Sequence, residues 1–350
     1  MNNSKKINIS ETKTIAILLV IVYHCMLFFG FKSDFWPLSP GIGSPAVIVA
    51  TSLLSSCMVP SLTLCSGFLF LMSLRNHPRS RVEMLKNRSR RLLVTYFLYG
   101  ALWLVPLYTL FDIPSFNRPL HTSFINGFIA MATGLFTDHL WFLLALFWAT
   151  LFFIIIRNLL DGRKMIIAGA LTIIAAACVE LFLSNIHYYC IAESGPFLIM
   201  FYIGMLLYHF NEEIEKWSSK IYYLIALCLL AILIITIFNY VPITIFRYVQ
   251  NILGGLMFYF IFLGFSRTSL SDRLNSSRFY GFCESHSMNI YLLNCPFMQI
   301  YFILIYPIIG TNILLTFICL LILSYPSIFI AVWVQDKLKK ALIKTIPIFN

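Results

Sequence analysis

Charged side chains are scarce in this 350-residue chain, and acidic ones are the scarcest. Asp, Glu, Lys and Arg make up 11% of the residues, against 60% for the hydrophobic types, and only 14 residues are acidic. A helix in a soluble protein needs a polar face, and successive stretches of this chain have none. The scarcity of charge therefore excludes a soluble protein and favours one that lies in a membrane.

The chain also lacks the cysteine patterns that are typical of metal centres and disulfide frameworks. Its nine cysteines include no C-x-x-C pair, and most of them fall within apolar stretches. They predict neither a metal site nor a set of disulfides. No A-x-A-like cleavage site follows the first apolar stretch, so we expect this stretch to remain as a helix rather than to be removed as a signal peptide.

Long uncharged runs indicate where helices cross the membrane. Each is long enough for about 20 residues to span a hydrocarbon core of roughly 30 Å. The run from 34 to 75 leaves room for one span and an outer loop, and the run from 284 to 336 divides near Pro307 and Gly310 into two. The clearest uncharged runs lie between Lys13 and Lys32, Arg91 and Asp112, Lys220 and Arg247, and Arg247 and Arg267. Together they predict an all-α polytopic membrane protein.

The positive residues predict its orientation, because cytoplasmic loops retain Lys and Arg. The segment from 118 to 138 is uncharged between its ends but more polar than the other runs. If it does not span, 22 of the 25 Lys and Arg residues lie inside, and only Lys32, Arg118 and Arg247 lie outside. If it spans, 12 basic residues downstream move outside, against the rule. We therefore expect about ten transmembrane helices, both termini in the cytoplasm, and an outer re-entrant or interfacial segment near residues 119–138.

We interpret residues 1–350 as a single membrane domain with cytoplasmic tails at about 1–12 and 336–350. The net charge of +11 follows from the same positive-inside bias and predicts no nucleic-acid partner. The expected location is the plasma (inner) membrane, with the lipid bilayer as the surrounding partner. The sequence does not define an oligomeric state.

One ionisable side chain, His24, lies within the first apolar run. Lys13 stands at the predicted cytoplasmic mouth of this helix, 11 residues earlier. At 1.5 Å per residue this is roughly 16 Å, about half the depth of the hydrocarbon core. Ionisable groups at this depth are costly and often mark functional sites. The pattern also fits a neutral histidine that hydrogen bonds to a neighbouring helix and has only a structural role.

A second candidate is the basic loop that covers residues 75–91. Seven of its 17 residues are Lys or Arg, and Arg88, Arg90 and Arg91 stand where the third predicted span begins. A topogenic signal or a contact with anionic lipid explains such charge. The alternative is an anion clamp for a phosphorylated cytoplasmic cosubstrate, because guanidinium groups pair bidentately with phosphate.

Polar residues in three further segments are candidates for substrate binding. Pro60 and the Ser66–Gly67 pair predict an interrupted helix that approaches a neighbour closely. On the predicted outer side, an aromatic belt would also explain Trp141. The candidates are Ser66, His139, Trp141, Glu284 and Asn294.

Taken together, these segments resemble the acyltransferase 3 family of integral membrane acyltransferases over nearly the whole chain. The spacing of Lys13 and His24 is similar to the family's basic-X10-His pattern, and Arg88-Ser-Arg-Arg91 to its Arg-x-x-Arg pattern. The order of the motifs along ten spans supports the resemblance. Further matches to its Ser-Gly, Trp-Phe and Ser-x-x-Ile-Tyr-Leu segments are Ser66-Gly67-Phe68-Leu69, Leu140-Trp141-Phe142-Leu143 and Ser287-Met-Asn-Ile-Tyr-Leu-Leu.

The resemblance implies an O-acetyltransferase that uses acetyl-CoA as its cosubstrate and holds no permanently bound cofactor. Such an enzyme moves acetyl from the cytoplasm to a hydroxyl of a cell-surface glycan or its lipid-linked precursor. His24 would act as a general base or a transient acyl acceptor. The chain departs from the pattern at Asn294, where many relatives carry His, and at Lys13, where many carry Arg. The residues that would bind the phosphates of the donor are Lys13, Arg88, Arg90 and Arg91.

Two other classes of function fit some of the same features. A transporter or flippase that moves a lipid-linked saccharide or acyl carrier without chemistry would also have interrupted helices and a central ionisable residue. The chain shows no inverted repeat or matched pair of interrupted helices to support it. A membrane scaffold would leave His24 and the basic loop with structural roles. Binding of CoA by the purified protein separates the enzyme from both.

Overall fold

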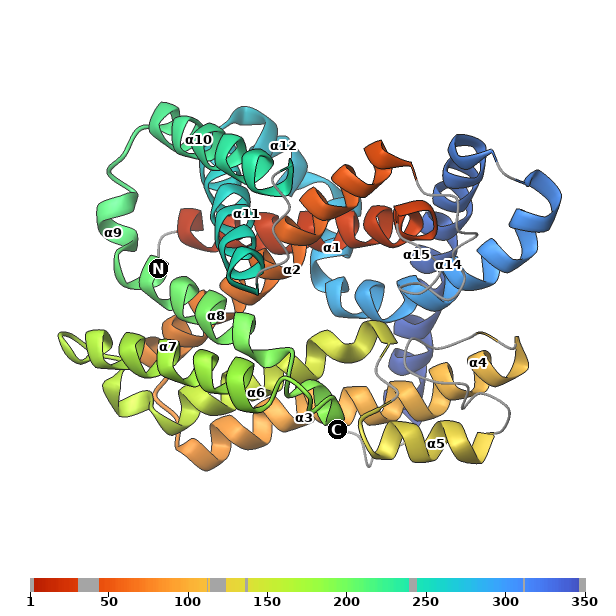
Figure 1. The fold of residues 1–350 in the computed structure, drawn as a ribbon, viewed down its shortest axis with the longest axis horizontal. Coiled ribbons are helices and arrows are strands. Elements are labelled where there is room, and N and C mark those ends of the chain that lie inside the picture. The colour runs from red at the N-terminus through yellow and green to blue at the C-terminus, as the bar shows by residue number, and fades with distance from the viewer. Residues whose placement is uncertain are drawn as a thin grey trace.

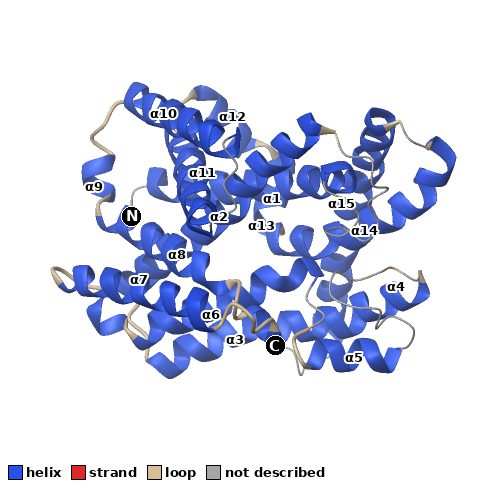
Figure 2. Ribbon diagram, in the orientation of Figure 1, coloured by secondary structure: helices blue, strands red, loops and turns tan. Residues whose placement is uncertain are grey.

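The computed structural model describes residues 3–30, 44–111, 113, 124–135, 138–238, 244–310 and 312–345. All regular secondary structure in these ranges is helical (Figures 1 and 2). Within them, nine helices are long and apolar enough to cross a membrane, and a tenth apolar helix is shorter. The prediction of an all-α polytopic membrane protein is confirmed.

The first half of the chain forms three long helices, one helix of 15 residues and two short ones. Ser80 begins the third long helix, because its hydroxyl accepts a hydrogen bond of 3.1 Å from the backbone N–H of Glu83. Pro106 has no N–H to bond back to the preceding turn, and the helix loosens there into a π-helical segment. The elements are α1 (Asn3–Gly30), α2 (Pro45–Asn76), α3 (Arg81–Tyr99), the π-helix η1 (Gly100–Leu104), α4 (Val105–Leu110), α5 (Phe124–Ala132), the 3-10 turn η2 (Asp138–Leu140) and α6 (Trp141–Ile155).

The second half adds six long helices and short connecting ones. The last long helix, like the first, extends into a predicted tail, since α1 begins at Asn3 and α15 ends at Thr345. The elements are η3 (Arg157–Leu159), α7 (Lys164–Phe182), η4 (Tyr188–Cys190), α8 (Ser194–His209), α9 (Asn211–Ile214), α10 (Ser219–Phe238), α11 (Thr244–Phe265), α12 (Ser269–Ser276), α13 (Arg278–Ser285), α14 (Ser287–Ile309) and α15 (Ile313–Thr345).

The segment predicted not to span contains the short helix α5. Its nine residues rise about 14 Å, too little to cross a bilayer. It packs against η1, where Met131 leaves no room for a side chain on Gly100. Residues 114–123 and 136–137 of this segment lie outside the described residues. Two of the three basic residues that we expect on the outer side, Lys32 and Arg118, also lie outside the described residues.

Contacts between loops define the path of the chain. After α6, Arg157 donates a hydrogen bond of 2.5 Å to the carbonyl of Arg79, and Asp161 lies 3.7 Å from the guanidinium of Arg75. The loop after α6 therefore lies on the same side of the bundle as the loop between α2 and α3, which we call the basic side. This requires α6 to cross back after α3–α4, with α5 not crossing. Its 15 residues rise only about 22 Å, but most are buried in the bundle.

The centre of the bundle is held by close contacts of α2 with its neighbours. A Cβ atom at Gly67 would lie 1.9 Å from the carbonyl oxygen of Phe201 in α8, which confirms the predicted close approach at Ser66–Gly67. The predicted interruption is wrong, because α2 continues as one helix through Pro60. α1 packs against α2 on one side and against α14 and α15 on the other. Figure 1 shows α1 crossing the middle of the molecule, so its side chains lie deep within the bundle.

Candidate active site

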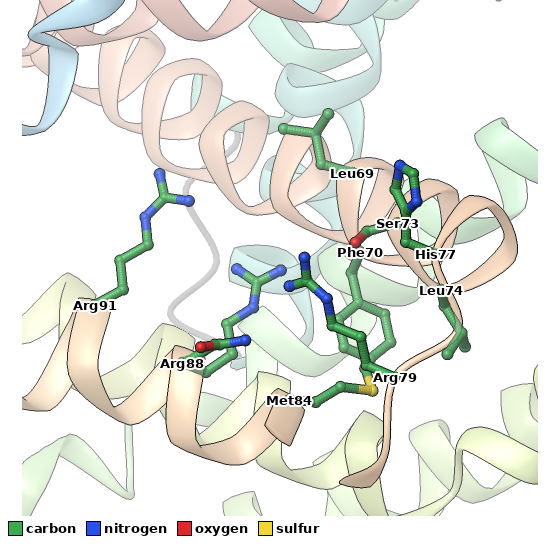
Figure 3. Close-up of a pocket in the computed structure, with 10 residues that line it drawn as sticks. Leu69, Phe70, Ser73, Leu74, His77, Arg79, Met84, Arg88 and Arg91 are labelled. Atoms are coloured by element: carbon green, nitrogen blue, oxygen red, sulfur yellow. The ribbon is translucent and has the colours of Figure 1, made fainter. Parts of the chain in front are cut away.

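A cavity of about 270 Å³ lies on the basic side, between the end of α2 and the start of α3. Figure 3 shows the side chains of Arg79, Arg88 and Arg91 extending from α3 and the preceding loop toward α2. No carboxylate is among the described residues that line it, so the cavity is strongly cationic. Its lining consists of Leu69, Phe70, Ser73, Leu74, His77, Arg79, Met84, Asn87, Arg88 and Arg91.

The helical period of α3 places its lining residues on one face. Arg91 stands four residues after Asn87 and three after Arg88, so it lies on the same side of the helix as each of them. The guanidinium of Arg88 lies 5.8 Å from the centre of the Phe70 ring, and the charges of Arg79 and Arg91 act on it. Like charges held this close repel one another, so a bound anion would relieve the repulsion. The predicted residue Arg90 is exposed on another face and does not line the cavity.

The sequence did not single out three of the polar lining residues, His77, Arg79 and Asn87. Asn87 stands four residues before Arg91, so the helical period that joins the two predicted arginines would have included it. Arg79 precedes α3, and its guanidinium also lies 3.4 Å from the carboxylate of Glu83. Its position follows from the turn before Ser80, which no helical period predicts.

The first turns of α1 adjoin this cationic group. Lys13 interacts electrostatically with Arg91 of α3 and with Glu284 of α13. Glu284 also accepts a hydrogen bond from the hydroxyl of Ser10. The structure thus brings together three of the predicted site residues, Lys13, Arg91 and Glu284, on the basic side, and α1 leads from them into the bundle.

His24 is buried in the bundle, with 9% of its surface exposed. Its Nδ1 lies 2.7 Å from Oδ1 of Asn294 in α14, and the Asn294 side chain is completely buried. The amide nitrogen of Asn294 donates to the carbonyl of Tyr291, 2.8 Å away. The sequence predicted the depth of His24 from its distance to Lys13, but it assigned Asn294 to substrate binding rather than to contact with His24.

A second buried imidazole, that of His139 in η2, lies close enough to interact electrostatically with His24. Pro296 cannot donate to the carbonyl of Leu292, and Nε2 of His139 bonds this carbonyl instead, at 2.9 Å. The hydroxyl of Tyr291 donates to the backbone carbonyl of His139. The proline therefore creates the anchor that holds η2 against α14.

A family model described as an acyltransferase domain matches residues 11–333. The chain belongs to the acyltransferase 3 family. No curated protein and no solved structure matches it. The matched range contains Lys13, His24, Arg88, Arg91 and Asn294, so the cationic cavity and the buried imidazoles belong to a multi-pass membrane acyltransferase.

Two further predicted residues of this acyltransferase, Trp141 and Ser66, make contacts within and between helices. The ring of Trp141 packs against Phe197 of α8, with ring centres 5.5 Å apart. Ser66 donates its hydroxyl to the carbonyl of Leu62 within α2, at 2.8 Å. These contacts give both side chains a place in helix packing. Asp138, which precedes His139, has a side chain outside the described part of the structure.

Proposed function

We propose that this acyltransferase moves acetyl from acetyl-CoA at the cytoplasmic face of the plasma (inner) membrane to a hydroxyl of a cell-surface glycan or its lipid-linked precursor. The observation that carries the proposal is a cationic cavity on the basic side, linked through Lys13 of α1 to a buried imidazole on the same helix. This arrangement suits a donor that is anionic at one end and reactive at the other.

The donor's phosphates would lie against Arg79, Arg88 and Arg91. Guanidinium groups remain charged when partly buried and bind phosphate oxygens in pairs. Lys13 adds a fourth positive charge at the inner edge of this site. From Lys13 to His24 the helix rises roughly 16 Å, so an extended thioester arm along α1 would place its carbonyl at mid-membrane.

His24 would carry the chemistry by one of two routes. As a general base, it takes the proton of the acceptor hydroxyl while the hydroxyl oxygen attacks the thioester carbonyl. The C–S bond then breaks, and the proton passes to the sulfur to give CoA thiol and an acetyl ester. As a nucleophile, the imidazole first attacks the thioester carbonyl, and the C–S bond breaks to release CoA as the thiolate. The hydroxyl oxygen then attacks the acetyl-imidazolium, the C–N bond breaks to give the acetyl ester, and the hydroxyl proton ends on the thiolate.

His139 supports an acceptor that bears a hydroxyl group. Its Nε2 must donate to the carbonyl of Leu292, so the neutral ring has a lone pair on Nδ1. Among the described residues this buried Nδ1 has no hydrogen-bond partner. A hydroxyl of the acceptor would supply the missing donor beside His24, and the acceptor would enter from the side opposite the basic side.

The test is acetyl transfer per folded molecule of His24→Ala. We expect a loss of at least about a hundredfold, because the proton or acyl acceptor is removed. Acetyl-CoA binding should persist, since the phosphates bind at the basic side. His187→Ala, which removes an exposed imidazole that faces Glu193, serves as the matched control. Near-wild-type turnover by folded His24→Ala would contradict the proposal.

Labelled donor separates the two routes. Acetyl-CoA labelled in the acetyl group, added without acceptor, should label the wild-type protein but not His24→Ala if an acetyl-imidazole forms. A general base leaves both proteins unlabelled. Transfer to acceptor with no labelled protein at any time would therefore assign direct transfer.

A further inference from the structure

The side-chain amide of Asn294 has a hydrogen-bond acceptor on one side and a donor on the other. Its Oδ1 can only accept hydrogen bonds, and its Nδ2 can only donate them. The two atoms look alike in most structures, so their assignment follows from the surrounding groups. In this chain the surrounding groups are a backbone carbonyl and the imidazole of His24.

The carbonyl of Tyr291 decides the orientation of the amide. A carbonyl oxygen only accepts, so the atom of Asn294 that lies 2.8 Å from it must be the amide nitrogen. The reversed orientation would bring two acceptors together in a completely buried site and leave both unsatisfied. Oδ1 must therefore face His24.

The orientation of the amide in turn decides the position of the proton on His24. Oδ1 carries no hydrogen, so Nδ1 of the imidazole must donate across the 2.7 Å contact. A neutral imidazole has one ring proton, and when Nδ1 holds it, Nε2 has the lone pair. We infer that Asn294 is a positioning residue that fixes the Nδ1–H tautomer of His24, so that Nε2 is the nitrogen that accepts the proton or the acetyl group.

The helices that carry the pair are held on both sides of it. The Tyr291 hydroxyl bonds the carbonyl of His139, and further along the helices the rings of Phe28 and Phe302 stack with centres 4.1 Å apart. These contacts hold α14 in place on both sides of Asn294. Because its amide is neutral, it orients the ring without competing for the proton that His24 transfers. The catalytic part of this inference rests on the proposed function, whereas the tautomer does not.

The tautomer can be measured without any activity assay. Protein containing ¹⁵N-labelled histidine shows which ring nitrogen is protonated through its NMR shifts, and His24→Ala identifies the signals of His24. We expect Nδ1–H in the wild type and a mixture of tautomers in Asn294→Leu, which cannot accept from Nδ1. Asn294→Asp should keep Nδ1–H, because a carboxyl oxygen can still accept. Gln299→Met is the matched control, since it removes another buried amide from α14 that accepts from Tyr108.

The kinetic measurement then tests positioning. With saturating acetyl-CoA, kcat of Asn294→Leu should fall at least about tenfold while the donor dissociation constant is unchanged. Asn294→Asp should recover part of the loss, and Gln299→Met should keep the wild-type kcat per folded molecule. An Nε2–H ring in the wild type, or identical His24 shifts in the wild type and Asn294→Leu, would overturn the inference. If His24→Ala stays active while the wild-type ring is Nδ1–H, the proposed function fails and the tautomer assignment stands.

Discussion

Gly67 and Gly204 decide how closely two central helices pack. A Cβ at Gly67 would lie 1.9 Å from the carbonyl oxygen of Phe201, and one at Gly204 would lie 2.0 Å from that of Leu64. Each glycine thus faces the backbone of the other helix. Lipid tails are as apolar as the side chains they replace, so close backbone packing rather than hydrophobic burial drives such contacts.

Gly67→Ala should therefore destabilise the protein although it adds one methyl group. The methyl must displace backbone, which forces α2 and α8 apart, and overpacking of this kind reduces the free energy of unfolding by about 1–3 kcal/mol. The loss of stability is measured as a lower melting temperature in thermal unfolding of the detergent-purified protein. Gly281→Ala is the matched control, because a Cβ at this exposed helical position meets nothing within 4 Å. Equal melting temperatures for the two variants would show that the contact between α2 and α8 is looser than 1.9 Å implies.

His24 and Asn294 show which properties of a single residue the sequence predicts and which it does not. The depth of His24 follows from a count of helical residues, because rise per residue is a local property. Its partner Asn294 lies 270 positions away, and nothing local to either residue indicates the contact. The resemblance to the family marked both positions, but only packing of α1 against α14 shows that one side chain binds the other.

At the scale of the element, the arginine face of α3 follows from the sequence, whereas the cavity beside it follows only from the packing of α3 against α2. The helical period of α3 places Arg88 and Arg91 on one face, as their spacing indicates. The cavity they line also requires Phe70 and Ser73 of α2, and the turn that brings α2 and α3 together carries Arg79.

We expect Arg88→Gln/Arg91→Gln to bind acetyl-CoA at least about a hundredfold more weakly. A hydrogen bond to a charged group contributes about 1.5–3 kcal/mol, and each 1.4 kcal/mol is tenfold in affinity. Lysine at both positions should restore affinity only in part, because the charge returns without the planar fork. The measurement is equilibrium binding of labelled acetyl-CoA to purified protein. Lys86→Gln removes an exposed charge from the same helix and should bind normally. Full binding by the double variant would leave the basic loop with a topogenic role.

At the scale of the whole molecule, contacts join the loops of the basic side into one group. Arg75 bonds Nδ1 of His209 at 2.8 Å, which adds the end of α8 to the loops after α2 and α6. The helix ends near both termini belong to a second set, since His286 lies 3.6 Å from Asp336 and Ser10 bonds Glu284. Lys13 and Arg91 connect the two sets. The positive-inside rule predicts from charge alone that these loops and helix ends lie on one side of the membrane. The contacts among the described residues place them together without use of the charges' sign rule.

Reporter fusions at residues 80, 160, 215, 275 and 345 should therefore report the cytoplasm, and fusions at 190 and 310 the outside. The chain must cross in alternate directions between these points, and cytoplasmic loops retain Lys and Arg. Position 215 is the sharpest test, because Arg267 donates to the carbonyls of Glu215 at 2.7 Å and Trp217 at 2.6 Å, which fixes it on the same side as 275. Outside signals at 160 and 215 with a cytoplasmic signal at 80 would mean that the segment after Arg118 spans. The contacts of Arg157 with Arg79 and of Arg75 with Asp161 would then be impossible, because their partners would lie on opposite sides of the membrane.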